Sequence, residues 1–226
     1  MGSAHILSTF ESALSEFRDN ALMMASLTQR NFEHARQGLF ERDEDWSNTV
    51  IADDEEVDTL EMQLDRQGID LMVRFHPVAS DLRTVVSTMK FSVNLERIAD
   101  QCVNIARRSR KLTSRTPVPE LVDLEAQYRF TGLMLDDAIR AFADNNVELA
   151  RTLRERDRTL DMMNRDFAEK LTSLMPEKPD YIPSYMDLIF TARFLERIGD
   201  QAKNIGDDVI YAVSAEESRH PRRVEE

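Results

Sequence analysis

A repeated eleven-residue segment constrains this chain more than any other feature. Residues 95–105 read Leu-Glu-Arg-Ile-Ala-Asp-Gln-Cys-Val-Asn-Ile, and residues 195–205 read Leu-Glu-Arg-Ile-Gly-Asp-Gln-Ala-Lys-Asn-Ile. Eight of the eleven positions are identical at a constant offset of 100. Helical periodicity alone seldom produces so many identities in one segment. The chain therefore contains two homologous units.

The hydrophobic pattern is helical along nearly the whole chain. It predicts six helices, over residues 6–38, 42–74, 78–111, 120–144, 147–174 and 183–213. Proline interrupts a helix at a cost of about 3 kcal/mol, so His76-Pro77, the run 113–119 and the run 175–183 mark helix ends. The sequence predicts an all-α fold of two tandem three-helix bundles, over 1–115 and 116–213, followed by a charged tail over 214–226.

The charge balance excludes several classes of function. Acidic residues outnumber basic ones by 42 to 29, for a net charge of −13. This balance argues against binding to duplex nucleic acid or to anionic lipid through a basic patch. No apolar stretch is long enough to span a bilayer, and no signal peptide opens the chain. The single cysteine, Cys102, fits a reducing compartment, so we expect a cytoplasmic protein.

Acidic residues recur in pairs spaced four apart, which places both carboxylates of a pair on one helix face. The pairs lie on the second and third predicted helix of each half and border apolar stripes. They are Asp54 with Asp58, Glu96 with Asp100, Asp157 with Asp161, and Glu196 with Asp200. Glu61 extends the first of them. Packing along those stripes would bring four carboxylates together in each half.

An unpaired buried charge costs several kcal/mol, so such clusters need compensation. Basic side chains, shared protons or a cation can supply it. Ligation by oxygen alone suits Mg, Ca, Mn or Fe. In the second half, Arg193 and Lys203 replace Val93 and Val103 and are placed to neutralise Glu196 and Asp200 without metal. The first half is therefore the stronger candidate.

The segment His76-Pro77-Val78-Ala79-Ser80-Asp81-Leu82-Arg83, followed by the two Leu-Glu-Arg-Ile segments, resembles the PhoU family of phosphate-transport accessory proteins. The resemblance covers about residues 6–213. It implies two tandem three-helix bundles, each with acidic pairs that bind multinuclear iron or zinc clusters in several members.

Carried over to this chain, the resemblance implies two ligand sets. The first is Asp54, Asp58, Glu96 and Asp100, and the second is Asp157, Asp161, Glu196 and Asp200. Glu61 is a further candidate ligand, although its counterpart in the second half is Asn164. Asn104 and Asn204 lie one turn beyond the motif, where they are placed to orient the ligands.

The resemblance also implies a role. PhoU-like proteins repress the phosphate-starvation response and restrain phosphate uptake by linking the phosphate ABC transporter, through its ATPase subunit, to a sensor histidine kinase. Members are commonly cytoplasmic homodimers that reach the membrane only through their partners. The resemblance thus implies a regulatory adaptor, without enzymatic turnover and without nucleic acid.

Two other readings stay open at this point. A di-iron oxidase would generally need Glu-x-x-His motifs, and none of His5, His34, His76 and His220 follows a glutamate by three residues. A metal-free helical scaffold would instead hold its acidic pairs with arginine or lysine. The sequence has no glycine-rich phosphate loop and shows no evident site for direct anion binding.

Overall fold

The computed structural model describes residues 2–216, with side chains from Ser8 onward. Helical segments account for nearly all of this range. They are α1 (Gly2–Phe40), α2 (Glu44–Phe75), α3 (Ala79–Thr113), the 3-10 helix η1 (Pro119–Asp123), α4 (Leu124–Asp144), α5 (Val147–Leu174), the 3-10 helix η2 (Pro179–Tyr181) and α6 (Ile182–Ser214).

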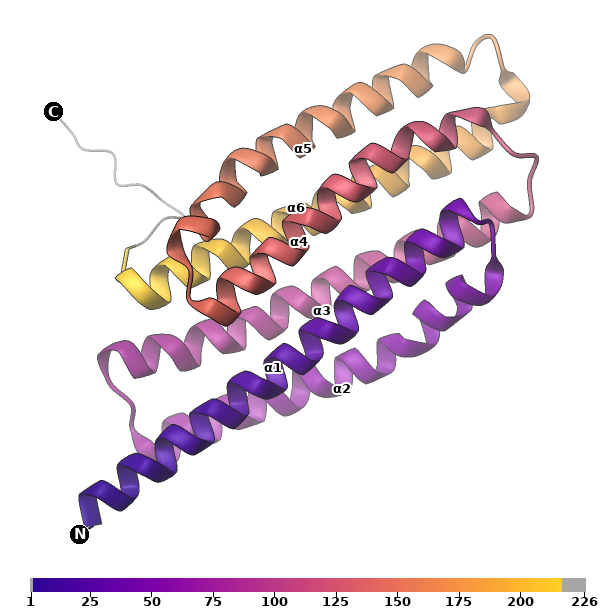
Figure 1. Cartoon of the computed structure of the whole chain (residues 1–226). Helices are drawn as coiled ribbons and strands as arrows, with labels where there is room; N and C mark the ends of the chain where they lie inside the picture. The colour runs from indigo at the N-terminus through magenta and orange to yellow at the C-terminus, as the bar shows by residue number, and fades with distance from the viewer. Residues whose placement is uncertain (1, 217–226) are drawn as a thin grey trace, which may run out of the picture.

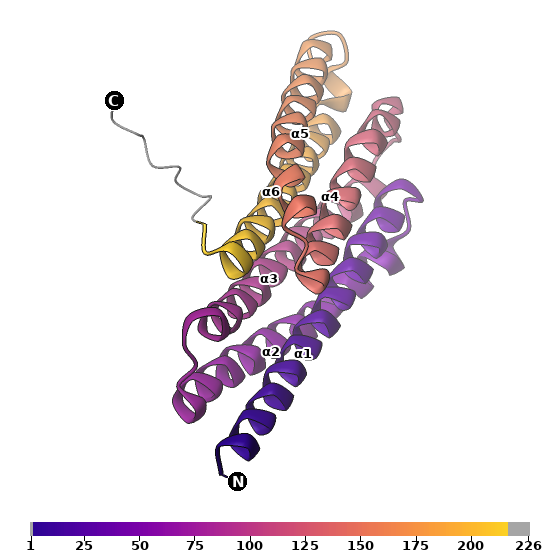
Figure 2. The same cartoon turned by 60° about the vertical axis from the view of Figure 1, so that its left-hand side comes forward.

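The helices form two bundles that lie side by side (Figures 1 and 2). Helices α1, α2 and α3 pack against one another in the first bundle, and α4, α5 and α6 do so in the second. The bundles meet through α3 and α6. The prediction of an all-α fold with two tandem three-helix bundles is confirmed.

Local signals set most of the helix ends. The Asp43 carboxylate accepts a hydrogen bond from the backbone N–H of Asp45 and caps α2. His76 adopts a left-handed conformation (φ 48°) that ends α2 just before Pro77. Asn146 caps α5 in the same way as Asp43 caps α2. Since such short-range signals are visible in a sequence, the predicted and observed ends mostly agree within two residues.

Helices α3 and α6, the last helix of each repeat, pack against each other and run antiparallel (Figure 1). The Ser87 hydroxyl donates to the carbonyl oxygen of Asp208 at one end of the contact. At the other end, Arg108 donates to the Asp187 carboxylate at 2.6 Å. Ser87 aligns with Asp187 and Arg108 with Asp208 in the repeat, so the two contacts are equivalent positions of a pseudo-two-fold arrangement.

The core consists mainly of leucine, isoleucine, alanine and phenylalanine side chains from all six α-helices. Cys102 is fully buried in it, and burial raises the pKa of its thiol far above the ordinary value. This thiol is therefore a core group, as its helix position indicates.

In the described part of the chain, no helix combines the length and the apolar character that crossing a membrane requires. Of the charged tail predicted over 214–226, residues 217–226 lie outside the described residues.

Candidate metal centre

The acidic residues of the first bundle come together across α2 and α3. Burial raises the pKa of Asp54, and the neighbouring charges of Asp58 and Asp100 raise it further. Burial likewise raises the pKa of Glu96, with added repulsion from Asp100 and Asp58. Each helix therefore contributes carboxylates to one shared negative cluster, as the sequence predicts.

Glu61 belongs to the same cluster. Its pKa is raised by burial first and then by the charges of Asp65 and Asp58, and its own charge acts on Glu96. We call Asp54, Asp58, Glu61, Glu96 and Asp100 the first acidic cluster.

The first acidic cluster is only partly buried and does not lie in the dry interior that the sequence predicts. Asp58 and Asp100 are exposed, while Asp54, Glu61 and Glu96 are half-buried. The spacing of four residues keeps both members of a pair on one helix face, but the second member of each pair, Asp58 or Asp100, is the more exposed one. The repulsion among these carboxylates is therefore partly screened by solvent.

No cation in the described part of the chain contacts the first acidic cluster. Among residues 8–216, none of its five carboxylates forms an ion pair with lysine, arginine or histidine. Arg107 lowers the pKa of Asp54 and Arg97 lowers that of Glu96, but both act through longer-range attraction. The cluster thus keeps an excess of negative charge.

In the second bundle, three of the equivalent carboxylates contact basic side chains. The Lys203 ammonium donates to Asp157 at 2.6 Å and to Asp200 at 2.7 Å, and so bridges α5 and α6. Arg193 donates to Glu196 at 2.8 Å. The neutralising role that the sequence indicates for Lys203 and Arg193 is therefore observed.

Two carboxylates of the second bundle are buried, as the sequence predicts. Burial raises the pKa of Asp157, and this effect outweighs the hydrogen bond from Lys203, which lowers the pKa. It also raises the pKa of Glu196 against the attraction of Arg193. One oxygen of each carboxylate, Asp157 Oδ1 and Glu196 Oε2, is buried and finds no hydrogen-bond partner among the described residues. Asp161 is exposed.

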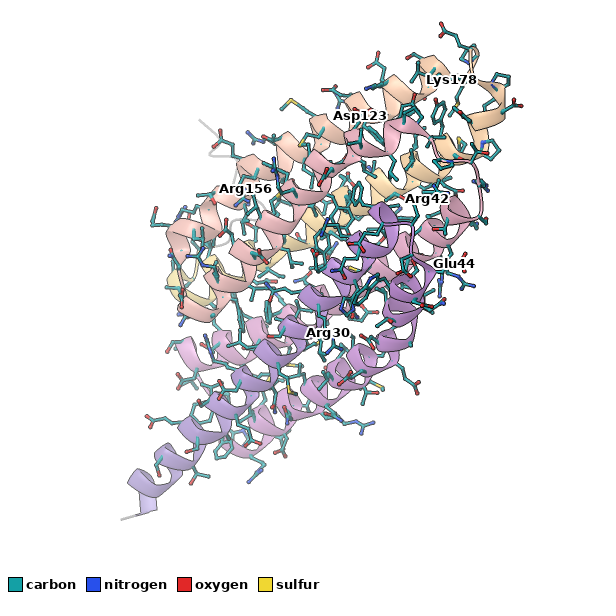
Figure 3. All side chains as sticks on the ribbon, turned by 45° about the vertical axis from the view of Figure 1, so that its right-hand side comes forward. Arg30, Arg42, Glu44, Asp123, Arg156 and Lys178 are labelled. Atoms are coloured by element: carbon teal, nitrogen blue, oxygen red, sulfur yellow. The ribbon has the colours of Figure 1, made fainter. Side chains whose placement is uncertain are left out.

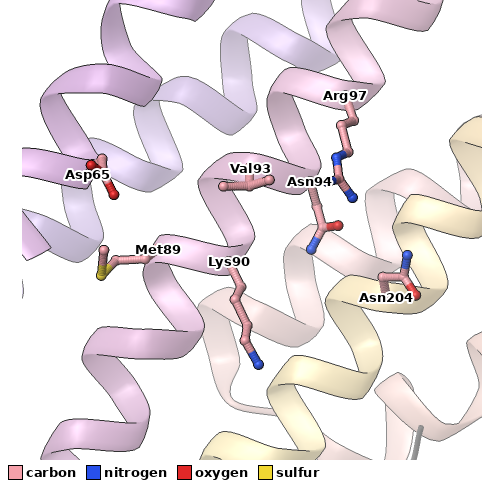
Figure 4. Close-up of a pocket in the computed structure, with 7 residues that line it drawn as sticks. All are labelled: Asp65, Met89, Lys90, Val93, Asn94, Arg97 and Asn204. Carbon is pink, nitrogen blue, oxygen red and sulfur yellow. The ribbon is translucent and has the colours of Figure 1, made fainter.

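The two asparagines that follow the motifs show no link to the carboxylates. Asn204 lines a pocket of about 320 Å³ between the bundles. Figure 4 shows Asn204 on α6, which lies on the side of α3 from which Asn94 and Arg97 project. Asn104 is half-buried. In the described residues, neither asparagine donates to a carboxylate of its own half, and their role in orienting ligands stays a prediction.

The donor chemistry of the first acidic cluster fits a hard cation, because every candidate ligand is a carboxylate oxygen. As the side chains stand, no three acidic, histidine or cysteine groups among the described residues are gathered closely enough to hold one ion. Ligation would require the half-buried and exposed carboxylates to rotate toward one another. In the second bundle, a metal would also have to displace Lys203.

The family of the chain follows from comparison with known proteins. Residues 22–109 and 126–209 each match the family model described as PhoU domain. The chain belongs to the PhoU family. The phosphate-specific transport system accessory protein PhoU homolog of Pseudomonas putida is 34% identical over 220 residues, which cover 96% of this chain and 85% of that protein. The PhoU accessory protein of Escherichia coli K12 is 31% identical and covers 96% of this chain and 90% of its own length.

Solved PhoU structures share the fold. The crystal structure of PhoU from Pseudomonas aeruginosa superposes with a TM-score of 0.89 at 30% identity, covering 92% of this chain and all of that one. The phosphate transport system regulatory protein PhoU from Streptococcus pneumoniae gives a TM-score of 0.85 at 23% identity, covering 92% of this chain and 98% of that one. The resemblance seen in the sequence is therefore confirmed.

Sequence reasoning missed the charged contacts between the bundles. Asp187, whose side chain is 4% exposed, contacts both Arg108 and Arg115. Asp208, also 4% exposed, accepts from Lys90 at 3.4 Å. The only signal in the sequence was that each acid interrupts an apolar face of the last helix, and its partners lie about eighty to one hundred and twenty residues away.

Proposed function

We propose that this PhoU-family chain is a regulatory adaptor of phosphate transport that binds a multivalent cation at the first acidic cluster. In this role it restrains phosphate uptake and represses the phosphate-starvation response when phosphate is plentiful. Its partners are the ATPase subunit of the phosphate ABC transporter and a sensor histidine kinase. It acts without turnover, in the cytoplasm, as a homodimer.

Family membership over nearly the whole chain supports the regulatory part of the proposal. The curated relatives are named accessory proteins of the phosphate-specific transport system. No helix in the described residues is suited to crossing a membrane, so contact with a transporter would be made through a peripheral surface.

One observation carries the proposal for the metal: five carboxylates of the first bundle act on one another electrostatically, and no cation among residues 8–216 contacts them. Iron, zinc, manganese or magnesium would offset their repulsion and link α2 to α3. The carboxylates would hold the ion, and the ion would supply a fixed positive charge between two helices. Asp157, Asp161, Glu196 and Asp200 are proposed as a second set, which competes with Lys203.

Lys203 favours one alternative for the second bundle. Because its ammonium already contacts Asp157 and Asp200, this bundle can hold its acids as a metal-free scaffold does. The di-iron oxidase reading has less support. His34 packs against Trp46 with the two rings tilted by 36°, and His76 caps α2. Of the two described histidine side chains, neither joins a carboxylate pair.

A complementation experiment tests both parts of the proposal. A deletion strain that carries a phosphate-responsive reporter receives either the unmodified chain, the variant E96Q/D100N or the control D166N/E169Q. The control makes the same change of charge at an exposed acidic pair on α5. We expect repression in high phosphate with the unmodified chain and the control, and loss of repression with E96Q/D100N.

Elemental analysis of the same purified proteins separates the two claims. We expect metal in the unmodified chain and in D166N/E169Q, and much less in E96Q/D100N. Normal repression in the deletion strain itself, with no second PhoU gene present, would refute the regulatory role. Equal metal content in all three proteins would refute the site.

A further inference from the structure

An open pocket of about 480 Å³ lies where the end of α3 meets the first turn of α2. Three cationic side chains line it together with a hydroxyl and one carboxylate. They are Arg107, Arg110, Lys111, Ser114 and Glu44. The three cations of α3 and its C-terminal cap Ser114 are spaced three, four and seven positions from the first, so they project from one face of the helix. Figure 3 labels Glu44 at this end of the first bundle.

The three cations have no carboxylate partner among the side chains that the structure describes. Within residues 8–216, Arg107, Arg110 and Lys111 form no ion pair. Their neighbours Arg108 and Arg115, by contrast, both contact Asp187 of the second bundle. In a chain with a net charge of −13, three adjacent cations that pair with no described carboxylate mark a local reversal of charge.

The end of α3 does not need these cations for its own carbonyl groups. The Arg42 guanidinium donates to the carbonyl oxygens of Leu112 at 2.7 Å, Thr113 at 3.0 Å and Arg115 at 2.6 Å. The last carbonyls of the helix are thereby satisfied from the connection between α1 and α2. The cations that line the pocket are left to face solvent and any anion that enters.

We infer that this pocket binds inorganic phosphate. Two guanidinium groups offer paired N–H donors that match the oxygens of a phosphoryl group, and Lys111 and Ser114 add single donors. Net charge in the pocket is positive, because three cations face one carboxylate. The sequence alone gave no sign of this site, because its residues read as the basic last turns of a helix.

Glu44 selects phosphate over sulfate. Both anions carry similar charge, but phosphate at neutral pH keeps at least one P–OH group, which donates a hydrogen bond to a carboxylate. Sulfate has no such donor and is repelled by it. A carboxylate among three cations therefore favours a protonated oxyanion.

The surroundings favour a small ligand over a polyanion. Asp100 lies seven residues before Arg107 on α3, about 10 Å along the helix, so the first acidic cluster begins where the cations end. An extended nucleic acid would leave the pocket and meet negative charge, whereas a single phosphate stays among the donors.

Titration calorimetry at constant ionic strength, with the full chain freed of metal by chelation, tests the inference. The ligands are inorganic phosphate and sulfate. The variant is R110Q/K111Q. The control R129Q/R165Q makes the same change of charge at exposed positions of the second bundle. We expect phosphate affinity to fall at least about tenfold in R110Q/K111Q and to change less than about twofold in the control.

Sulfate should bind the unmodified chain at least about tenfold more weakly than phosphate. In E44Q the dissociation constants of the two anions should lie closer together. Thermal unfolding of each variant checks that the fold is kept. Equal loss of phosphate affinity in R110Q/K111Q and the control, absence of saturable binding, or equal binding of sulfate would overturn the inference. The choice of phosphate rests on the proposed function, but metal is absent from this assay, so failure of the metal site would not affect it.

Discussion

Removing the ammonium of Lys203 tests how the second bundle holds its carboxylates. In the variant K203M, Asp157 loses a partner at 2.6 Å while its side chain stays only 11% exposed. Breaking a buried ion pair by removing one partner costs about 3–5 kcal/mol, because the other charge stays buried. Lys203 is itself 23% exposed, which places the expected loss near the lower end, about 3 kcal/mol.

The second contact of Lys203 adds little to this figure. Asp200 is 41% exposed, so solvent screens its pair, and such pairs contribute at most about 1 kcal/mol. For a chain of this length, a loss of about 3 kcal/mol lowers the melting temperature by roughly 6–12 °C. Adding D157N should recover most of the loss, because the stranded charge is removed.

Urea and thermal denaturation in the presence of a chelator measure these differences. The matched control is K170M, which breaks a pair with Asp123 whose side chains are 52% and 37% exposed. We expect the control to lose less than about 1 kcal/mol. Similar losses in K203M and K170M would show that the bridge between α5 and α6 is not a buried one. Stabilisation of K203M by a divalent cation would indicate that the second acidic set can hold metal.

Three further predictions concern other charged groups. In the metal-free chain, the pKa of Glu96 is raised by burial and by Asp100, so its contribution to stability is full below its unfolded pKa and is lost as pH rises through the folded value. The free energy of unfolding should therefore fall as pH rises above the ordinary range of a glutamate carboxyl, and E96Q should flatten that fall in urea titrations. In the metal-loaded chain, D100A should lower metal content and melting temperature together. A drop in melting temperature at unchanged metal content would count against ligation. R108M should cost up to about 3 kcal/mol in urea denaturation, since Asp187 keeps only Arg115, and a loss below about 0.5 kcal/mol would contradict a buried inter-bundle pair.

Much of the fold follows from short-range signals in the sequence. The helix predicted over 147–174 is observed with the same ends, because Asn146 caps its start and Pro176 follows its last turn. The start predicted at 120 is wrong by four residues. Pro119 opens a 3-10 helix there, and the α-helix begins only at Leu124. The preference between those two helix types depends on packing, which the local pattern does not contain.

The candidate site was harder to predict than the fold. Spacing placed Glu96 and Asp100 on one face and identified Lys203 as a neutralising cation, both of which the structure shows. Spacing did not show that Asp100 faces water, or that Lys203 reaches across to Asp157 on another helix. Distances between helices depend on tertiary packing, which the local periodicity of a single sequence does not determine.

The pseudo-two-fold crossing of α3 and α6 has a mechanical consequence. Ser87 bonds to Asp208 near one end of the contact between α3 and α6, and Arg108 bonds to Asp187 near the other end. Two attachments so far apart along the helices oppose rotation of one central helix relative to the other. We therefore expect the central pair to move as one unit, so that a change of shape in either half would appear mainly in the outer helices α1, α2, α4 and α5.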